Sequence, residues 1–249
     1  MHFMRPRVNT GISILDKMLN NGIPEGDQVA LAGSAGVGKT LTAFEFLYKN
    51  AKAGHSSLFF SLEESPIQIV ENAKAAFTDF NDIDDIIAKG VLTVEGADIK
   101  DTIRAAGSGD QSQMNYVFSS VVNQISNSIK AHNATRVVID SLTTFKLLLK
   151  EPLTYRLLSL SLLSVLKELK VTSLLTLEVM TGSRDHLQYQ PEFFIYDGII
   201  ALYATAEERN RIHSLEVLKM RGTKHSFRTV PYVIADNGIN PIIAVENVL

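Results

Sequence analysis

The sequence predicts an α/β fold with a mostly parallel central sheet, helices on its faces and an antiparallel extension at the C-terminal end. Strand-like apolar runs alternate with helical periodicity for about the first 180 residues, which indicates βαβ units. A glycine-rich turn joins the first clear strand to a helix. Beyond this part, strand-like runs follow one another across short turns, as is typical of antiparallel pairing.

Each element of the parallel part has its own signal. Apolar runs predict strands at 28–32, 56–62, 91–94, 136–140 and 171–179. Helical spacing of apolar residues predicts helices at 41–48, 66–77, 114–132 and 152–170. Ser65 and Pro66 open the second of these helices, because Ser supplies a side-chain acceptor and Pro fits the first helical position.

The remaining segments are shorter. Strands are expected at 195–203, 212–220, 227–234 and 241–245. Loops are expected at 105–113 and 182–194, and the acidic stretch 79–85 is expected to be a solvated, turn-rich surface. Because no linker-like composition and no internal repeat is visible, we expect one domain over residues 1–249.

Composition excludes several classes of protein. The chain has 249 residues, 45% of them hydrophobic, and a net charge of −3, so no global field attracts nucleic acid or anionic membrane. With no cysteine, disulfides and thiolate metal sites are excluded. The most apolar segment, 157–166, is half the length of a membrane span, and no secretory signal is visible. We therefore expect a cytoplasmic protein without membrane insertion.

Residues 33–40 read G-S-A-G-V-G-K-T and match the phosphate-binding pattern G-x-x-x-x-G-K-[ST] between a strand and a helix. Glycines let the backbone curl around an anion, and the freed N–H groups point at phosphates. Lys39 is expected to reach the β- and γ-phosphates, and the Thr40 hydroxyl to hold Mg²⁺. In this context a chance glycine-rich turn is the weaker interpretation. The expected nucleotide contacts are Ser34, Ala35, Gly36, Val37, Gly38, Lys39, Thr40 and Leu41.

Asp140 ends a strand of buried β-branched residues and is the expected second metal ligand, with Ser141 after it as a candidate for holding a metal-bound water. Ligands gather at the carboxyl ends of parallel strands. Glu63 and Glu64 follow the second strand at the same edge, where one carboxylate can align or deprotonate an attacking water. The alternative is that both only decorate the N-terminus of the next helix. Glu178, at the end of a later strand, is a weaker candidate.

A basic cluster closes the strand at 212–220. Lys219, Arg221, Lys224 and His225 lie within seven residues, around a turn at Gly222. They are either an ordinary basic hairpin or a set of cations delivered from a neighbouring subunit to a developing γ-phosphate charge. Sequence spacing leaves both interpretations open.

These motifs resemble the KaiC-like ATPases of the RecA superfamily, and the chain is similar to a single-domain member because it holds one phosphate loop. The resemblance covers nearly the whole chain. It lies in the loop itself and in the motifs at 9–16, 22–26, 61–65 (S-L-E-E-S), 138–142 (V-I-D-S-L), 196–200, 219–225 (K-M-R-G-T-K-H) and 234–239.

The resemblance implies an α/β RecA-like P-loop ATPase that uses ATP and Mg²⁺, assembled as a hexameric ring with ATP between subunits. It implies that Glu63 and Glu64 are catalytic together with Lys39, Lys219 and Arg221. It also implies that Lys219, Arg221, His225 and Asp236 contact the neighbour's nucleotide, and that Thr40 and Asp140 bind the metal.

Three functions are compatible with these motifs. The first is a ring ATPase that couples hydrolysis to a conformational change or an unknown protein client, and the intact glutamate pair favours it. The second is an ATP-responsive regulatory or assembly scaffold with little turnover, of the archaellum accessory type. The third, less favoured, is a RecA-like DNA recombination or repair ATPase. The segments 105–113 and 182–190, which could act as pore loops, carry too few cations for phosphate contacts.

Overall fold

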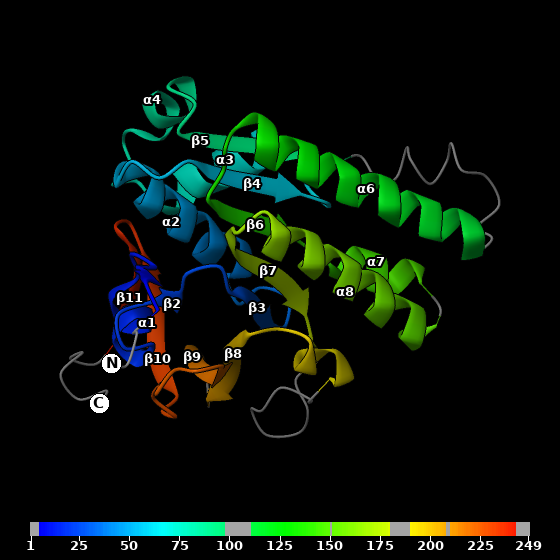
Figure 1. Ribbon diagram of the computed structural model, residues 1–249. Helices are drawn as coiled ribbons and strands as arrows, with labels where there is room; N and C mark the ends of the chain where they lie inside the picture. Colours follow the sequence, from blue (N-terminus) through cyan, green and yellow to red (C-terminus); the bar gives the residue numbers. More distant parts are fainter. Residues whose placement is uncertain (1–4, 98–110, 150, 180–189, 208–209, 243–249) are drawn as a thin grey trace.

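The computed structural model describes residues 5–97, 111–149, 151–179, 190–207 and 210–242 (Figure 1). Its centre is a nine-stranded sheet in the order β11-β10-β9-β8-β3-β7-β6-β4-β5. A separate two-stranded sheet pairs β1 (Arg7–Val8) with β2 (Ile23–Pro24). The predicted fold class is confirmed, including the antiparallel C-terminal strands.

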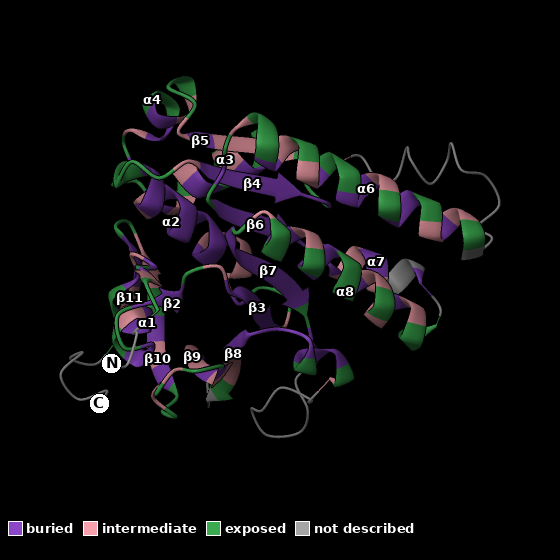
Figure 2. Cartoon of the chain, in the orientation of Figure 1, coloured by how far each residue is buried: buried purple, intermediate pink, exposed green. Residues whose placement is uncertain are grey.

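The parallel strands form the buried part of the sheet. They are β3 (Gln28–Gly33), β4 (Ser57–Ser61), β5 (Leu92–Gly96), β6 (Arg136–Asp140), β7 (Thr172–Glu178) and the start of β8 (Gly198–Glu207). Every residue of β3, β4 and β6 is buried. Continuous burial follows because helices cover both faces of a parallel sheet, as the purple centre of Figure 2 shows.

Alternate strand residues divide the core into two halves. Val29 and Phe59 pack with the helices of one face, which are α1 (Ser13–Met18), α2 (Lys39–Lys52), α3 (Pro66–Ala76) and α4 (Ile83–Ala88). Ala30 and Phe60 pack with those of the other, α6 (Gln111–Ala131), α7 (Thr143–Leu148) and α8 (Pro152–Glu168). In Figure 1, α6 and α8 run side by side over their face. In the described part of the chain no helix is both long enough and apolar enough to cross a bilayer.

The antiparallel extension follows a short 3₁₀ turn at Pro191–Phe194. It runs through β8, β9 (Asn210–Met220), β10 (Val230–Ala235) and β11 (Gly238–Pro241). Neighbouring strands here pair antiparallel throughout. The extension places β10 and β11 beside the helical face that contains α1 and α2 (Figure 1).

Several sequence-based boundaries were wrong. The acidic stretch 79–85 runs into α4, because Ile83 and Ile86 lie one helical turn apart and are buried. Residues 111–113, expected in a loop, begin α6. The last described strand begins at 238 rather than 241, because Ala235 pairs directly with Gly238 across a tight turn, and residues 243–245 of the expected strand lie outside the described residues. Strand β8 begins at 198 rather than 195. The rest of the two expected loops, 105–110 and 182–189, lies outside the described residues.

Candidate functional site

Four neighbouring strands end at one edge of the sheet and bring most of the predicted site together. Gly33 at the end of β3 is in register with Glu178 of β7. Asp140 at the end of β6 is in register with Ser61 of β4. Since β3, β7, β6 and β4 are adjacent and parallel, the phosphate loop and the acids that follow these strands converge at their carboxyl ends.

The loop adopts the conformation that its glycines permit. Gly36 and Gly38 have φ values of 78° and 82°, in the left-handed region that side-chain-bearing residues avoid. Helix α2 begins directly after Gly38, and no side chain caps its first N–H groups. These donors at the start of a 14-residue helix are suited to an anion. Lys39 lies over the loop, where its Nζ donates to the Ser34 carbonyl at 2.8 Å.

Thr40 and Asp140 meet, as the metal-site prediction requires. The Thr40 hydroxyl donates to Asp140 Oδ2 at 2.8 Å, and the Thr176 hydroxyl donates to Oδ1. Burial raises the pKa of Asp140, and the negative charge of Glu63 adds to this, whereas the hydroxyl hydrogen bonds oppose it. Burial lowers the pKa of Lys39, while the surrounding carboxylates favour its charged form.

This pair fits a magnesium ion chemically, because Mg²⁺ prefers hard oxygen ligands and uses few protein groups. In the described ranges no group of three or more His, Cys, Asp or Glu side chains is placed to hold a metal. Thr40 and Asp140 are thus suited to a metal that takes its other ligands from phosphate and water.

The two glutamates have different surroundings. Glu63 Oε1 accepts from the hydroxyls of Ser141, at 2.9 Å, and Thr144, at 2.7 Å, so the residue after β6 and the first turn of α7 orient this carboxylate. Glu64 Oε2 accepts from Asn72 Nδ2 at 3.0 Å on α3. Burial raises the pKa of Glu64, and the charges of Asp140 and Glu63 raise it further.

Ser65 caps α3 by accepting from the Gln68 N–H at 3.3 Å, as expected, and the alternative that the charges of the two glutamates favour the N-terminus of this helix stays a prediction. Glu178 is exposed, and its backbone N–H donates to the Thr143 hydroxyl at 2.7 Å. Its charge lies close enough to influence Lys39. No hydrogen bond described in the structure links the Glu178 carboxylate to the network around Asp140.

Lys219 and Arg221 lie toward the amino-terminal ends of the parallel strands, whereas the phosphate loop lies at their carboxyl ends. Lys219 pairs with Ile199, which in turn pairs with Ala30 near the start of β3, whereas the phosphate loop follows the end of β3. Lys219 Nζ donates to the Tyr196 carbonyl at 2.6 Å. The structure therefore does not bring these two cations to the loop of their own chain.

Arg221 is more than half exposed, and its guanidinium bonds the Phe194 carbonyl at 2.9 Å and the Asp197 carboxylate at 3.3 Å. His225 lies in the segment that follows β9, where the Ser226 N–H donates to the Met18 carbonyl of α1. Asp236 is exposed in the turn between β10 and β11, and its carbonyl accepts from the Asp79 N–H at 3.1 Å.

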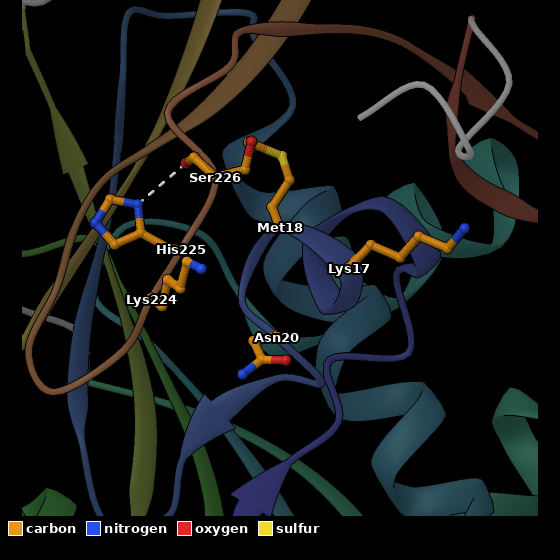
Figure 3. A pocket seen from close by; sticks show the side chains of 6 residues that line it. All are labelled: Lys17, Met18, Asn20, Lys224, His225 and Ser226. Atoms are coloured by element: carbon orange, nitrogen blue, oxygen red, sulfur yellow. Dashed lines mark hydrogen bonds between the residues drawn. The ribbon is translucent and has the colours of Figure 1, made fainter. Parts of the chain in front are cut away.

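His225 lines a pocket of about 360 Å³ (Figure 3). Its Nδ1 lies 3.1 Å from the Ser226 carbonyl, drawn as the dashed line. The other lining residues come from α1, the turn after it and the segment following β9: Lys17, Met18, Asn20, Lys224 and Ser226. Lys17 and Lys224 line this pocket with His225, and the Lys17 side chain extends away from His225 (Figure 3).

Sequence reasoning missed the polar residues that support the site. Thr176 and Thr144 hold Asp140 and Glu63, and the Tyr232 hydroxyl donates to the Val37 carbonyl inside the loop. Tyr232 lies 195 positions from Val37, and nothing in its local pattern marks it as other than a core residue. Only the folded arrangement of the strands reveals these contacts.

The fold and this edge of the sheet define a P-loop nucleotide-binding protein of the RecA superfamily. A family model described as "ATPase: KaiC" matches residues 8–245. The chain belongs to the KaiC ATPase family, and membership supports ATP binding and ATPase activity in general terms.

Relatives of two lengths are similar to this chain. It is 33% identical over 243 residues to UPF0273 protein PH0284 of Pyrococcus horikoshii, covering 95% of this chain and 94% of the relative. It is 31% identical over 236 residues to the circadian clock oscillator protein KaiC of a Picosynechococcus strain, but spans only 44% of that protein. The crystal structure of the KaiC-like protein PH0186 from Pyrococcus horikoshii OT3 superposes with a TM-score of 0.78, at 30% identity, over 96% of this chain and 100% of that one.

Proposed function

We propose that this protein is a Mg²⁺-dependent ATPase, one domain over residues 1–249, that works as a ring with ATP at its subunit interfaces. The observation that carries the proposal is the junction of the phosphate loop with β6. There Thr40 and Asp140 are 2.8 Å apart at the edge where the Glu63 carboxylate is held by two hydroxyls. A nucleotide-binding loop alone needs neither the acid nor the oriented glutamate.

The phosphate chain would lie against the N–H groups of residues 34–41, with Lys39 on the β- and γ-phosphates. Lys39 is well placed, because it reaches over the loop and its charge is already compensated by nearby carboxylates. Thr40 and Asp140 would hold Mg²⁺, which neutralises phosphate charge when bound. Burial is the main cause of the raised pKa of Asp140, and a cation bound beside it would favour its charged form.

Hydrolysis requires a group that orients and deprotonates water. Glu63 is the stronger candidate, because Ser141 and Thr144 fix its Oε1 and leave Oε2 without a described hydrogen-bond partner. Glu64 lies beside it, and burial together with the charges of Asp140 and Glu63 raises its pKa, so it belongs to the same cluster of coupled carboxylates. We propose that the pair acts together, with Glu63 orienting the water and Glu64 tuning the local charge.

The position of the cations supports the proposed assembly. Lys219 and Arg221 lie at the edge opposite their own loop, so they can act on phosphate only if a second subunit presents its loop to them. His225 and Asp236 are proposed to contact the same neighbouring nucleotide, with the pocket of Figure 3 forming part of that surface. Six subunits, a cytoplasmic location and an unknown protein client remain parts of the proposal inherited from the family.

One experiment separates this function from its rivals. ATP hydrolysis is measured against oligomer size by chromatography with light scattering, with and without Mg²⁺ and single-stranded DNA. We expect turnover that appears with assembly, requires Mg²⁺ and ignores DNA. Assembly with ATP bound but no turnover would establish the scaffold instead. Strong stimulation by DNA would establish the recombination-type enzyme, and turnover by the monomer would overturn the interfacial site.

A further inference from the structure

The hairpin formed by β10 and β11 lies directly on the phosphate loop and its helix. The Tyr232 hydroxyl donates to the Val37 carbonyl at 2.5 Å. Tyr232 is 1% exposed, and burial raises the pKa of its phenol well above the ordinary value, so the hydroxyl stays protonated and remains a donor. Val37 is itself fully buried at the centre of the loop.

The hairpin makes two further contacts, one with the loop and one with α2. Ile234 Cδ1 lies 2.8 Å from the place that a β-carbon on Gly38 would occupy, so the hairpin closes over the loop at its second left-handed glycine. Two turns further along α2, Glu45 Oε2 accepts from the Ile239 N–H at 2.7 Å. The hairpin therefore touches the loop and α2 in sequence, rather than at one accidental point.

The hydrogen bond to Val37 has a directional consequence. The carbonyl of Val37 and the N–H of Gly38 belong to one planar trans peptide unit, so they point in opposite directions. Fixing the carbonyl toward β10 fixes the N–H away from β10. Because Gly38 has wide conformational freedom, this peptide would otherwise rotate readily. The N–H groups of this loop are the ones expected to face phosphate.

We propose that Tyr232 is a positioning residue of the nucleotide site, which sets the direction of the Gly38 N–H by holding the Val37 carbonyl. The proposal rests on the proposed function in one respect, namely that a nucleoside triphosphate occupies the loop. The same hairpin carries Asp236 at its turn. Tyr232 thus ties a subunit's own loop to a segment proposed to meet the neighbouring nucleotide.

The test compares Tyr232→Phe with a matched control, Tyr203→Phe. Tyr203 is 2% exposed on β8, next to Leu202, which pairs with Gly33, but its hydroxyl donates to Glu216 Oε1 on β9 at 2.8 Å rather than to the loop. Each substitution removes one buried hydroxyl. For each protein, hydrogen exchange of amides 34–40 is followed without nucleotide, Mg-ATP affinity is measured by calorimetry, and global unfolding is measured in urea.

We expect Tyr232→Phe to speed exchange in the loop about tenfold and to weaken ATP binding about tenfold, which is about 1.4 kcal/mol. Tyr203→Phe is expected to keep wild-type values for both while losing a similar amount of global stability. Wild-type exchange and affinity in Tyr232→Phe would overturn the proposal, as would equal effects of both variants.

A second variant keeps the test decisive if Tyr232→Phe does not fold. Ile234→Val removes the Cδ1 atom that faces Gly38 and leaves the hydroxyl untouched. Because Ile234→Val keeps the Tyr232 donor, we expect loop exchange to stay at the wild-type rate; exchange as fast as that expected on loss of the hydroxyl would show that hairpin packing fixes the loop, and would overturn the proposal. Exchange without nucleotide does not depend on ATP binding. A wild-type protein that binds no ATP would therefore refute the proposed function, while the exchange data would still decide the role of Tyr232.

Discussion

The Thr40 hydroxyl and the Asp140 carboxylate are joined by a 2.8 Å hydrogen bond across 100 positions of sequence. The bond unites the first turn of α2 with the end of β6. Asp140 is only 6% exposed, so its charge is stabilised mainly by the two hydroxyls that donate to it and by nearby Lys39. A cation bound beside this buried carboxylate would favour its charged form further.

Replacing Lys39 with Ala should abolish ATP binding, weakening it by at least about 100-fold, because the loop loses its only side-chain charge among residues 33–40. Calorimetric titration with Mg-ATP checks this. The matched control is Lys52→Ala, which removes a half-exposed lysine from the other end of α2, where it pairs with Asp82 at 3.0 Å. Tight binding by Lys39→Ala would refute the loop assignment.

Glu63→Gln combined with Glu64→Gln should keep ATP binding and reduce turnover by about 100-fold or more, because a neutral amide cannot accept the proton of water. Single-turnover hydrolysis with calorimetry separates the two effects. In the single variants Glu63→Gln should account for most of the loss. The control is Glu71→Gln on α3, where Glu71 pairs with Lys74 on the surface. Unchanged turnover in the double variant would reduce the pair to a helix-end feature.

Arg221→Ala should lower turnover by about 100-fold or more, as expected for a cation that stabilises transferring phosphate. Subunits of this variant mixed with Lys39→Ala subunits should regain activity, since each Lys39→Ala subunit still offers Arg221 to a neighbour's intact loop. The control is Arg156→Ala, because the Arg156 guanidinium also donates to a backbone carbonyl of the 3₁₀ turn at Pro191–Phe194, namely that of Pro191, at 2.9 Å. Mixed rings that stay inactive would show that delivery from a neighbour is wrong.

Glu45 should make stability depend on pH. It is 2% exposed in α2, and burial raises its pKa from 4.5 to about 7 against the opposing Ile239 hydrogen bond and Lys49. Between these values the folded state holds a proton that the unfolded chain has released. The free energy of unfolding should therefore fall as pH rises from about 4.5 to about 7, by up to about 3 kcal/mol.

Urea unfolding at pH 5, 6, 7 and 8 and fixed protein concentration checks this slope. Glu45→Gln is the control, because its amide oxygen can still accept from Ile239 but carries no titrating group. This variant should lose about 3 kcal/mol less across the same interval than the wild type. If the free energy of unfolding depended on pH in the same way in both proteins, burial would not raise the pKa of Glu45 in the folded state.

Local patterns were enough to predict much of the fold and the phosphate loop. The continuous burial of β3 and β6 follows from their apolar runs, and the start of α3 at Pro66 follows from its cap. The phosphate loop is encoded within eight consecutive residues. Helix α4 was missed because its two buried isoleucines are spread among aspartates. The last strand was expected to begin at 241 rather than 238, because strand pairing, not composition, sets where β11 begins.

By itself, the sequence determined which chemical groups exist and the local conformation of the loop that carries them, since glycines and helix caps act over a few residues. Only the tertiary structure decided which groups meet. Strand order brings Asp140 and Glu63 to the loop and leaves Arg221 at the far edge, and it lays Tyr232 on Val37. The physical reason is that pairing between strands distant in sequence depends on the burial of the whole sheet, which no short segment encodes.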